Sequence, residues 1–345
     1  MAEILGALLA ALRERPAFAK LEADDLVELP ATGTAHGHVR LRGQNLLARV
    51  AYAHPGDPTA PGRLRTQAAA FRLLAPSERT PALHDVLPPR EGLPGGALIV
   101  DYIEGEPPRL PRDLAAIAET LAVIHSMPVP SANSPLPRQK NPFLETLETI
   151  ELNAARFLDG AVRDSGAKAE IAEELRLMRG MALAFAKRPQ PLGVVLADTH
   201  PGNFIVKPDG IAIFVDLEKV HVGSPAIDLA HATLPTSTLW HPAIGKVLTP
   251  GQVEGFYAAY LARVGKKRAA ELAPWLMPMR RLTWLRTTLF MARWRVETRS
   301  PRDPSDPGQW SDAGLEPAMK AHIDTRIDRC FDRDTIVAIR SEWLT

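Results

Sequence analysis

The chain has 345 residues, of which 46% are hydrophobic, and its 41 basic and 40 acidic side chains give a net charge of +1. This length allows two domains, and the balanced charge, without a long basic run, argues against a nucleic-acid-binding protein. A single cysteine, Cys330, excludes an intramolecular disulfide framework and a cysteine-rich zinc site.

The N-terminal segment is a poor signal peptide, because its apolar stretch is short and an acidic residue comes early. No segment approaches the ~20 apolar residues of a membrane span. We therefore expect a cytoplasmic protein with no membrane partner. Apolar residues between positions 4 and 12 recur at helical spacing and predict an amphipathic helix that ends before Pro16.

Strand-like segments follow from Leu26, with a turn at Gly43-Gln44. Gly33 and Gly37 predict a loop whose backbone could approach a phosphate, although a plain hairpin loop is an alternative. We expect His36 and His38 in this loop to be exposed rather than metal-binding.

Arg49 stands in an otherwise apolar strand. If that strand is buried, the arginine needs an anionic partner; if it is an edge strand, the side chain faces water. A helix over 62–74 follows and carries Gln67, and an apolar strand over 97–105 precedes Pro107-Pro108, where we expect the lobe boundary.

The rest of the chain is mainly helical by periodicity. The pattern therefore predicts an α+β protein with a small strand-rich lobe and a larger helical lobe. Helices are expected over 114–124, 142–159, 167–187, 251–264, 274–296, 315–330 and 333–343.

The segment 192–230 carries the chemistry. Two short apolar segments flank Lys-Pro-Asp-Gly, which predicts a hairpin. With the turn centred on Asp209-Gly210, Asn203 faces Asp216 at the open end, and Asp198 enters the same end. Carboxylate and amide oxygens suit Mg²⁺. The alternative is that these residues cap loops, as Asp and Asn often do.

The sequences LADTHPGNFIV and FVDLEKVHVGSPAIDLA resemble the catalytic loop and metal-binding segment of the aminoglycoside phosphotransferase and choline kinase-like family, relatives of the protein kinases. LIVDYIEG resembles its hinge. The resemblance implies a two-lobed protein kinase-like fold. Residues 1–103 would form the nucleotide-binding lobe, and residues 104–345 the helical lobe with the catalytic loop, the metal-binding hairpin and the acceptor site.

The resemblance also implies roles for single residues. Asp198 would be the catalytic aspartate, Asn203 and Asp216 would hold Mg²⁺, and Arg49 would reach the phosphates of ATP or GTP. The hinge main chain at Asp101, Tyr102 and Ile103 would receive the purine. Gly33 would belong to the phosphate-covering loop, and Asp228 would brace the catalytic loop. Gln67 would occupy approximately the position where the family has a helix glutamate that pairs with the strand cation.

Glu218 could be a supporting metal group or a solvent-facing carboxylate. His200 permits a different interpretation, in which Asp198, His200 and Asp216 hold a hydrolytic metal ion, but a loop histidine is more often packed or solvated. The resemblance implies instead a kinase that transfers a γ-phosphoryl group to a hydroxyl of a small metabolite or antibiotic-like acceptor.

Three departures from the family pattern raise the alternative of a pseudokinase that binds nucleotide without turnover, although Asp198, Asn203 and Asp216, the residues nearest the chemistry, are all present. The loop begins Leu196-Ala197-Asp198 where the family usually has His-Gly-Asp, Gln67 replaces a glutamate, and the Gly33–Gly37 loop is loose. The acceptor would contact the region 274–297, whose polar and aromatic residues either line the cleft or face solvent. These residues are Arg281, Trp284, Arg286, Arg295 and Glu297. The sequence does not predict the oligomeric state.

Overall fold

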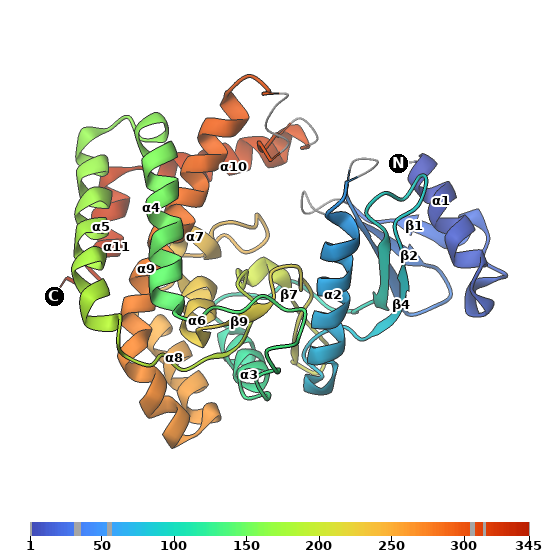
Figure 1. The fold of residues 1–345 in the computed structure, drawn as a ribbon, viewed down its shortest axis with the longest axis horizontal. Helices are drawn as coiled ribbons and strands as arrows, with labels where there is room; N and C mark the ends of the chain where they lie inside the picture. The colour runs from blue at the N-terminus through green and yellow to red at the C-terminus, as the bar shows by residue number, and fades with distance from the viewer. Residues whose placement is uncertain (1, 31–35, 54–56, 304–307, 313–314, 345) are drawn as a thin grey trace.

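The computed structural model describes residues 2–30, 36–53, 57–303, 308–312 and 315–344. It has a small lobe built around an antiparallel sheet and a larger, mainly helical lobe (Figure 1). The expected α+β class and two-lobed arrangement are therefore confirmed. Among the described helices, none is both long and apolar enough to cross a membrane.

The small lobe holds a five-stranded sheet with the strand order β1-β2-β3-β5-β4. Because β3 is central, Arg49 does not lie on an edge strand. β5 ends at Asp101 rather than at residue 105, since Asp101 pairs with Leu46, the first residue of β3, and the chain beyond has no partner strand. β4 was not predicted. The strands are β1 (Leu26–Glu28), β2 (His36–Leu41), β3 (Leu46–Ala51), β4 (Leu83–Leu87) and β5 (Ala97–Asp101).

The two faces of this sheet are covered by different helices. Ala97 and Ile99 of β5 belong to the hydrophobic cluster of α1 (Ala2–Arg13), whereas Leu98 and Val100 belong to that of α2 (Ala60–Leu74). Successive strand residues point to opposite faces, so β5 has no polar face. In Figure 1, α2 lies on the side of the sheet that faces the large lobe.

The hydrophobic cluster of α2 continues into the large lobe. Phe71 and Leu74 of α2 share it with Leu121 of α3 and Phe214 of β8, and all four side chains are almost fully buried. The two lobes are therefore joined by one continuous apolar core on this side. Burial of these side chains favours the native arrangement by roughly 25 cal/mol per Å² of apolar surface removed from water.

The large lobe contains the seven expected helices. One of them, α9, begins at Lys266 rather than at residue 274, because Pro274 lies inside the helix instead of starting it, and the other ends shift less. α6 and α7 were not predicted, because α6 is buried on all sides and therefore lacks an amphipathic stripe. The helices are α3 (Leu114–His125), α4 (Pro142–Ala161), α5 (Ser165–Phe185), α6 (Pro225–Thr233), α7 (Pro235–Thr238), α8 (Pro250–Val264), α9 (Lys266–Arg299), α10 (Pro317–Cys330) and α11 (Arg333–Arg340). Between Asp101 and Leu114 the chain passes from the sheet to α3, so the expected boundary at residue 103 stays a prediction.

Two short antiparallel pairs position the site: β6 (Gly193–Val195) with β9 (His221–Gly223), and β7 (Phe204–Val206) with β8 (Ala212–Phe214). The predicted hairpin is confirmed, but its predicted register is wrong by one residue. Phe204 pairs with Phe214, and the N–H of Val215 donates to the Asn203 carbonyl at 3.0 Å. The reason is a three-residue loop that ends in Gly210 at φ 83°, a left-handed residue typical of a bulged hairpin turn.

Candidate active site

The loop that follows β6 is held in place from α6. Asp228 is fully buried, and its carboxylate accepts hydrogen bonds from the N–H groups of Leu196 at 2.7 Å and Ala197 at 2.8 Å. Its Oδ2 also lies 3.0 Å from Nε2 of His125. Ala197 has φ 63°, a left-handed conformation that is uncommon for a residue other than glycine. Asp228 therefore braces the loop, as the resemblance implied.

Arg286 of α9 holds the same loop from the other side. Its Nη2 donates to the carbonyl of Ala197 at 2.8 Å. Of the other residues expected near the acceptor, Arg281 pairs with the fully buried Glu174 at 2.6 Å, and Trp284 is in the core. Arg295 pairs with Asp328, and Glu297 pairs with Arg293. These side chains therefore neither form a basic wall of the cleft nor face solvent. The charged ones form ion pairs with residues of α5, α9 and α10.

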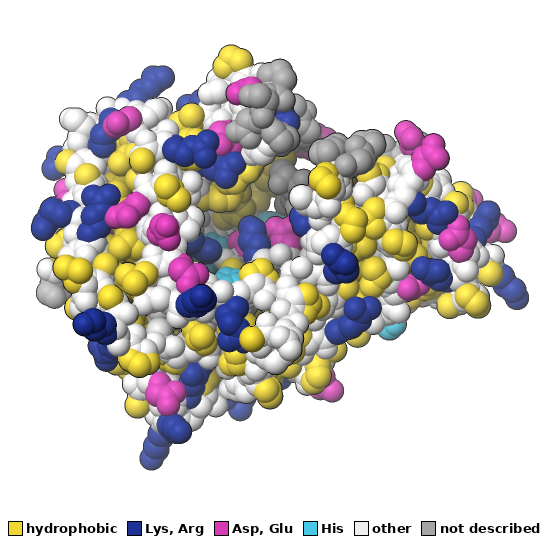
Figure 2. All heavy atoms as spheres, in the orientation of Figure 1, with side chains coloured by type: hydrophobic (Ala, Val, Ile, Leu, Met, Phe, Trp, Pro, Cys, Tyr) yellow, Lys and Arg dark blue, Asp and Glu magenta, His cyan; other side chains and the backbone are white. Residues whose placement is uncertain are grey.

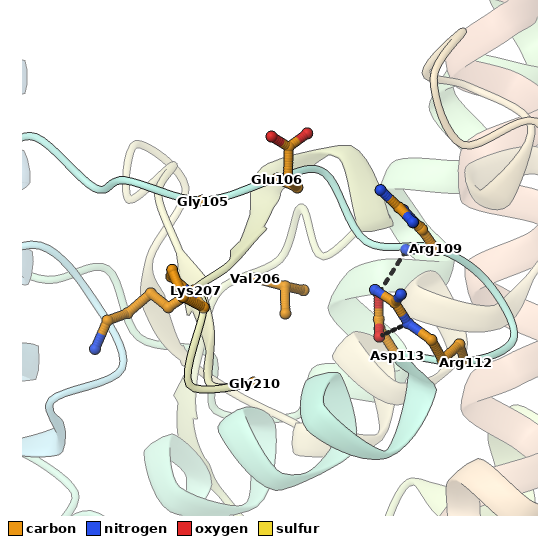
Figure 3. A pocket seen from close by; sticks show the side chains of 9 residues that line it. Gly105, Glu106, Arg109, Arg112, Asp113, Val206, Lys207 and Gly210 are labelled. Carbon is orange, nitrogen blue, oxygen red and sulfur yellow. Dashed lines mark hydrogen bonds and ion pairs between the residues drawn. The ribbon is translucent and has the colours of Figure 1, made fainter.

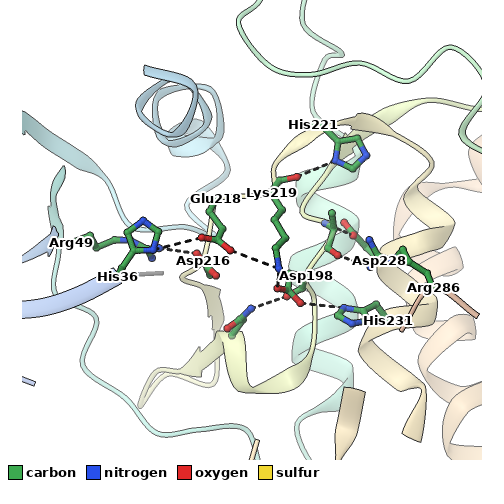
Figure 4. A network of polar contacts seen from close by, with 12 residues as sticks. His36, Arg49, Asp198, Asp216, Glu218, Lys219, His221, Asp228, His231 and Arg286 are labelled. Carbon is green, nitrogen blue, oxygen red and sulfur yellow. Dashed lines mark hydrogen bonds and ion pairs between the residues drawn. The ribbon is translucent and has the colours of Figure 1, made fainter. Parts of the chain in front are cut away.

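Asp198 lies between two cationic or basic groups (Figure 4). Its Oδ2 is 2.5 Å from Nζ of Lys219, and its Oδ1 is 3.8 Å from Nδ1 of His231. Burial raises the pKa of Asp198, but the charge and hydrogen bond of Lys219, together with His200 and His231, outweigh it and hold the pKa well below its ordinary value. Burial also keeps the pKa of His231 well below 6.5. Asp198 is therefore an ionised carboxylate, the form that accepts a proton.

Asn203 ends a short helical turn, Pro201–Asn203, directly before β7. Its Nδ2 donates to the backbone carbonyl of Asp198 at 2.8 Å. This bond fixes the Asn203 side chain against the loop that carries Asp198. It leaves the amide oxygen, Oδ1, free to accept a hydrogen bond or to bind a cation.

Arg49 and Asp216 form an ion pair between the lobes. Nη2 of Arg49 donates to Oδ1 of Asp216 at 2.7 Å, and Nη1 donates to the carbonyl of Val215. Arg49 is 5% exposed, so the buried strand cation has the anionic partner that it needs. Burial raises the pKa of Asp216, but the charge and the hydrogen bond of Arg49 together outweigh it and lower the pKa overall.

His36 and Gln67 contact each other rather than solvent or Arg49. Nε2 of His36 lies 3.2 Å from Oε1 of Gln67, and both residues are buried. The expected exposure of His36 and His38 is therefore wrong, because both lie in β2, where His36 is buried and His38 is half-buried. Gly37 also lies in β2 rather than in a loop. Burial and the charge of Arg49 lower the pKa of His36 to about 4, and burial likewise lowers the pKa of His38 to about 4.

Glu218 lies between His36 and Lys219. Its Oε2 is 3.6 Å from Nδ1 of His36, and its Oε1 is 3.7 Å from Nζ of Lys219. Burial and the negative charge of Asp216 raise the pKa of Glu218. Glu218 therefore points into the site and is not a solvent-facing loop carboxylate.

The hinge residues lie at the end of β5. The N–H of Asp101 donates to the Ala82 carbonyl, and the N–H of Tyr102 donates to the Asn45 carbonyl. These bonds leave the main chain of Ile103 as the hinge group that we expect to receive a purine. Gly33, the remaining residue expected at the nucleotide, lies outside the described residues.

The donor set fits a magnesium ion in its chemistry. Asp216 uses Oδ1 for Arg49, and Asn203 uses Nδ2 for the loop, so each keeps one oxygen. Mg²⁺ prefers such oxygen ligands and usually keeps several waters. The hydrolytic alternative is less well supported. In the described part of the chain, one group of three His, Cys, Asp or Glu residues has its ligand atoms within 4.8 Å of one another. It consists of His36, Asp216 and Glu218, and it includes neither Asp198 nor His200.

The site opens into a hollow between the lobes, where Figure 2 shows basic, acidic and histidine side chains gathered together. A separate depression of about 570 Å³ lies outside this hollow, between the β7–β8 hairpin and the linker that precedes α3 (Figure 3). Arg109, Arg112 and Lys207 are among the residues that line it. None of its lining residues was predicted to bind nucleotide or metal.

Two site residues, Lys219 and His231, were missed by sequence reasoning. Lys219 stands in a short loop next to Glu218, and alternating charges there indicate an ordinary solvated turn. His231 follows Asp228 by three residues, which places both on one helical face, and would have been found had α6 been predicted. Arg286 was named only as one of five residues of the acceptor region, because nothing in the sequence of α9 shows which arginine contacts the loop.

Residues 38–272 match the model of the phosphotransferase enzyme family. The chain belongs to this family. No curated protein sequence matches it. Among solved structures, this family member is similar to a choline/ethanolamine kinase family protein from Mesorhizobium loti, with 18% identity, a TM-score of 0.60 and coverage of 98% of this chain and 99% of that one.

This family member is also similar to two aminoglycoside phosphotransferases. One is the ADP-bound APH(2'')-Ib, with 14% identity, a TM-score of 0.54 and coverage of 97% of this chain and 99% of that one. The other is the GDP complex of aminoglycoside 2'-phosphotransferase-IIIa, with 12% identity, a TM-score of 0.60 and coverage of 97% and 98%. At these identities the likeness shows the shared fold alone.

Proposed function

We propose that this protein is a kinase that transfers the γ-phosphoryl group of ATP or GTP to a hydroxyl group of a small-molecule acceptor. The observation that carries the proposal is the ion pair between Arg49 and Asp216, at 2.7 Å. It brings the expected phosphate-binding cation of the small lobe against the expected metal-binding carboxylate of the large lobe. The family match supports phosphoryl transfer as the reaction class.

In the proposed reaction, Asp198 orients the acceptor hydroxyl and accepts its proton. The acceptor oxygen forms a bond to the γ-phosphorus, the bond from that phosphorus to the bridging oxygen breaks, and the nucleoside diphosphate leaves. The lowered pKa of Asp198 keeps the carboxylate ionised at neutral pH and able to accept the hydrogen bond of the hydroxyl.

The nucleotide would lie between the hinge and Asp216. Arg49 would contact the α- and β-phosphates, and the main chain of Ile103 in the hinge would contact the purine. Mg²⁺, held by Asn203 and Asp216, would neutralise phosphate charge when bound. The fold neighbours include an ADP-bound and a GDP-bound enzyme, so the screen below uses both ATP and GTP.

A screen for nucleoside diphosphate release tests this function. The panel contains amino alcohols, sugars, amino acids and aminoglycosides, each with ATP or GTP and Mg²⁺. We expect one acceptor class to raise turnover, and we expect Asp198→Asn to lower that turnover at least 100-fold while Asp209→Asn, in the exposed hairpin turn, leaves it unchanged. Full turnover by Asp198→Asn would contradict the proposed role.

A nucleotide-binding module without turnover is the second candidate. Two observations favour it: Lys219 already pairs with the carboxylate of Asp198, and Leu196 replaces the histidine of the family loop. Thermal-shift measurements with ATP and GTP, with and without Mg²⁺, separate the two candidates, because a ligand that binds only the folded state raises its stability. Binding without any acceptor-dependent turnover supports the module, and no shift with any nucleotide contradicts both candidates.

A further inference from the structure

We infer that His36, Asp216 and Glu218 form a binding site for a divalent transition-metal ion, with His36 as a nitrogen ligand from the small lobe. One ligand atom of each residue lies within 4.8 Å of the others. Two ligands on opposite sides of an ion, with bonds of about 2.1 Å, are about 4.2 Å apart. The side chains would therefore have to move the most distant pair closer by up to about 0.6 Å to bind one ion on opposite sides.

The contact between His36 and Gln67 sets the chemistry of the imidazole. The atom that faces Nε2 is the amide oxygen of Gln67, at 3.2 Å, which can only accept a hydrogen bond. Nε2 therefore carries the ring hydrogen, and Nδ1 carries a lone pair. Ligand histidines in metal sites are oriented in this way, with the second ring nitrogen donating to an oxygen. This arrangement also gives a reason for Gln67, whose partner is His36 rather than Arg49.

Each of the three residues has its second polar atom occupied. His36 uses Nε2 for Gln67, and Asp216 uses Oδ1 for Arg49, so this ion would share Oδ2 of Asp216 with the proposed Mg²⁺. Glu218 has Oε1 near Lys219, at 3.7 Å, and Oε2 near Nδ1 of His36, at 3.6 Å. Nδ1 and the Glu218 carboxylate are thus two hydrogen-bond acceptors that face each other, an arrangement that a cation between them would satisfy (Figure 4).

The donor set decides the class of ion. An imidazole nitrogen with two carboxylates suits Mn²⁺, Co²⁺ or Zn²⁺ better than Mg²⁺, which prefers oxygen ligands. The two carboxylates and the neighbouring Arg49 give a net charge of −1, so a divalent ion leaves +1 beside the expected phosphates. His36 lies on β2 and the carboxylates follow β8, so the ion would join the two lobes.

Titration of the full-length protein with Mn²⁺ alone tests this site. Binding is followed by electron paramagnetic resonance, and ligation by nitrogen is read from the electron spin echo modulation of ¹⁴N. For the unchanged protein we expect one Mn²⁺ ion with ¹⁴N modulation, and at least tenfold weaker competition by Mg²⁺. We expect His36→Asn to weaken Mn²⁺ binding at least tenfold and to remove the modulation. The matched control, His38→Asn on the same strand, keeps both.

Two further variants keep the test decisive if His36→Asn does not fold. Gln67→Leu should weaken Mn²⁺ binding about tenfold but keep the ¹⁴N signal. Tenfold is the lower end of the effect of losing a residue that orients a metal ligand. Glu218→Gln should weaken binding and also keep that signal. Absence of Mn²⁺ binding, binding without ¹⁴N modulation, or equal binding by His36→Asn would each overturn the inference.

The measurement uses neither nucleotide nor acceptor. A protein that lacks turnover can therefore still bind the ion, and an active kinase without nitrogen ligation overturns this inference alone.

Discussion

The ammonium nitrogen of Lys219 lies 2.5 Å from Oδ2 of Asp198. Lys219 also lies next to the proposed metal site, because Oε1 of Glu218 is 3.7 Å from the same ammonium group. Lys219 thus links the expected proton acceptor with the region expected to hold the phosphates.

Replacing Lys219 by Met should move the pH dependence of turnover. In the unchanged protein the charge of Lys219 holds the pKa of Asp198 low, against the effect of burial. Without that charge the pKa rises, so the ionised form is lost at a higher pH on the acid side. We expect the acidic limb of the pH profile of kcat/KM to move to higher pH. Lys219→Arg keeps the charge and should keep the profile; an unmoved limb in Lys219→Met would contradict this account.

Replacing Arg49 by Met should weaken nucleotide binding. The guanidinium group is the buried cation of the small lobe at this site, and a hydrogen bond to a charged group contributes about 1.5–3 kcal/mol. We therefore expect affinity for ATP or GTP to fall at least about tenfold, measured by calorimetry. Arg42→Met, in the exposed turn before β3, is the control and should bind as the unchanged protein does. Equal affinity in Arg49→Met would remove Arg49 from the phosphate site.

Replacing Ala197 by Gly should stabilise the fold. A left-handed conformation costs an L-residue roughly 1–2 kcal/mol, and glycine removes this cost. The greater conformational freedom of glycine in the unfolded chain offsets about 0.4–1 kcal/mol of the resulting stabilisation. The net expectation is about 0.5–1 kcal/mol of added stability in urea unfolding. Ala169→Gly, at an exposed position within α5, should instead lose about 1 kcal/mol. A loss of stability in Ala197→Gly would mean that the methyl group makes a compensating contact.

Replacing Asp228 by Asn should damage both stability and turnover. An amide offers one accepting oxygen where the carboxylate serves the N–H groups of Leu196 and Ala197, and its NH₂ group would face a donor. We expect a loss of about 2–4 kcal/mol in urea unfolding. The control is Asp159→Asn, whose side chain is 92% exposed in its pair with Lys168 and which should change stability by less than about 1 kcal/mol. Unchanged unfolding of Asp228→Asn would contradict the bracing role.

The fold could be predicted largely because its elements carry local signals. Helices such as α3 show apolar residues at helical spacing, and the hairpin carries Asp209-Gly210. The exact register was not predictable from that dipeptide, since Gly210 could end a two-residue or a three-residue loop. α6 escaped prediction for the opposite reason, because burial on every side leaves no stripe to recognise.

The site was less predictable than the fold, because its contacts join distant segments. The sequence indicated Asp198, Asn203, Asp216 and Arg49 as a group, and the structure brings Arg49 and Asp216 into contact. It gave no indication that Gln67 would meet His36, 31 residues earlier in the chain. The arginines of α9 show the same limit, since their partners lie on other helices.

The apolar core shared by α2, α3 and β8 has a consequence for how the protein comes apart. Phe71 and Leu74 lie in the same cluster as Leu121 and Phe214, so separating the lobes would expose both halves of that cluster to water. The small lobe is then not an autonomous folding unit. A polypeptide of residues 1–103 should aggregate or remain unstructured, and the intact chain should show a single cooperative melting transition in calorimetry.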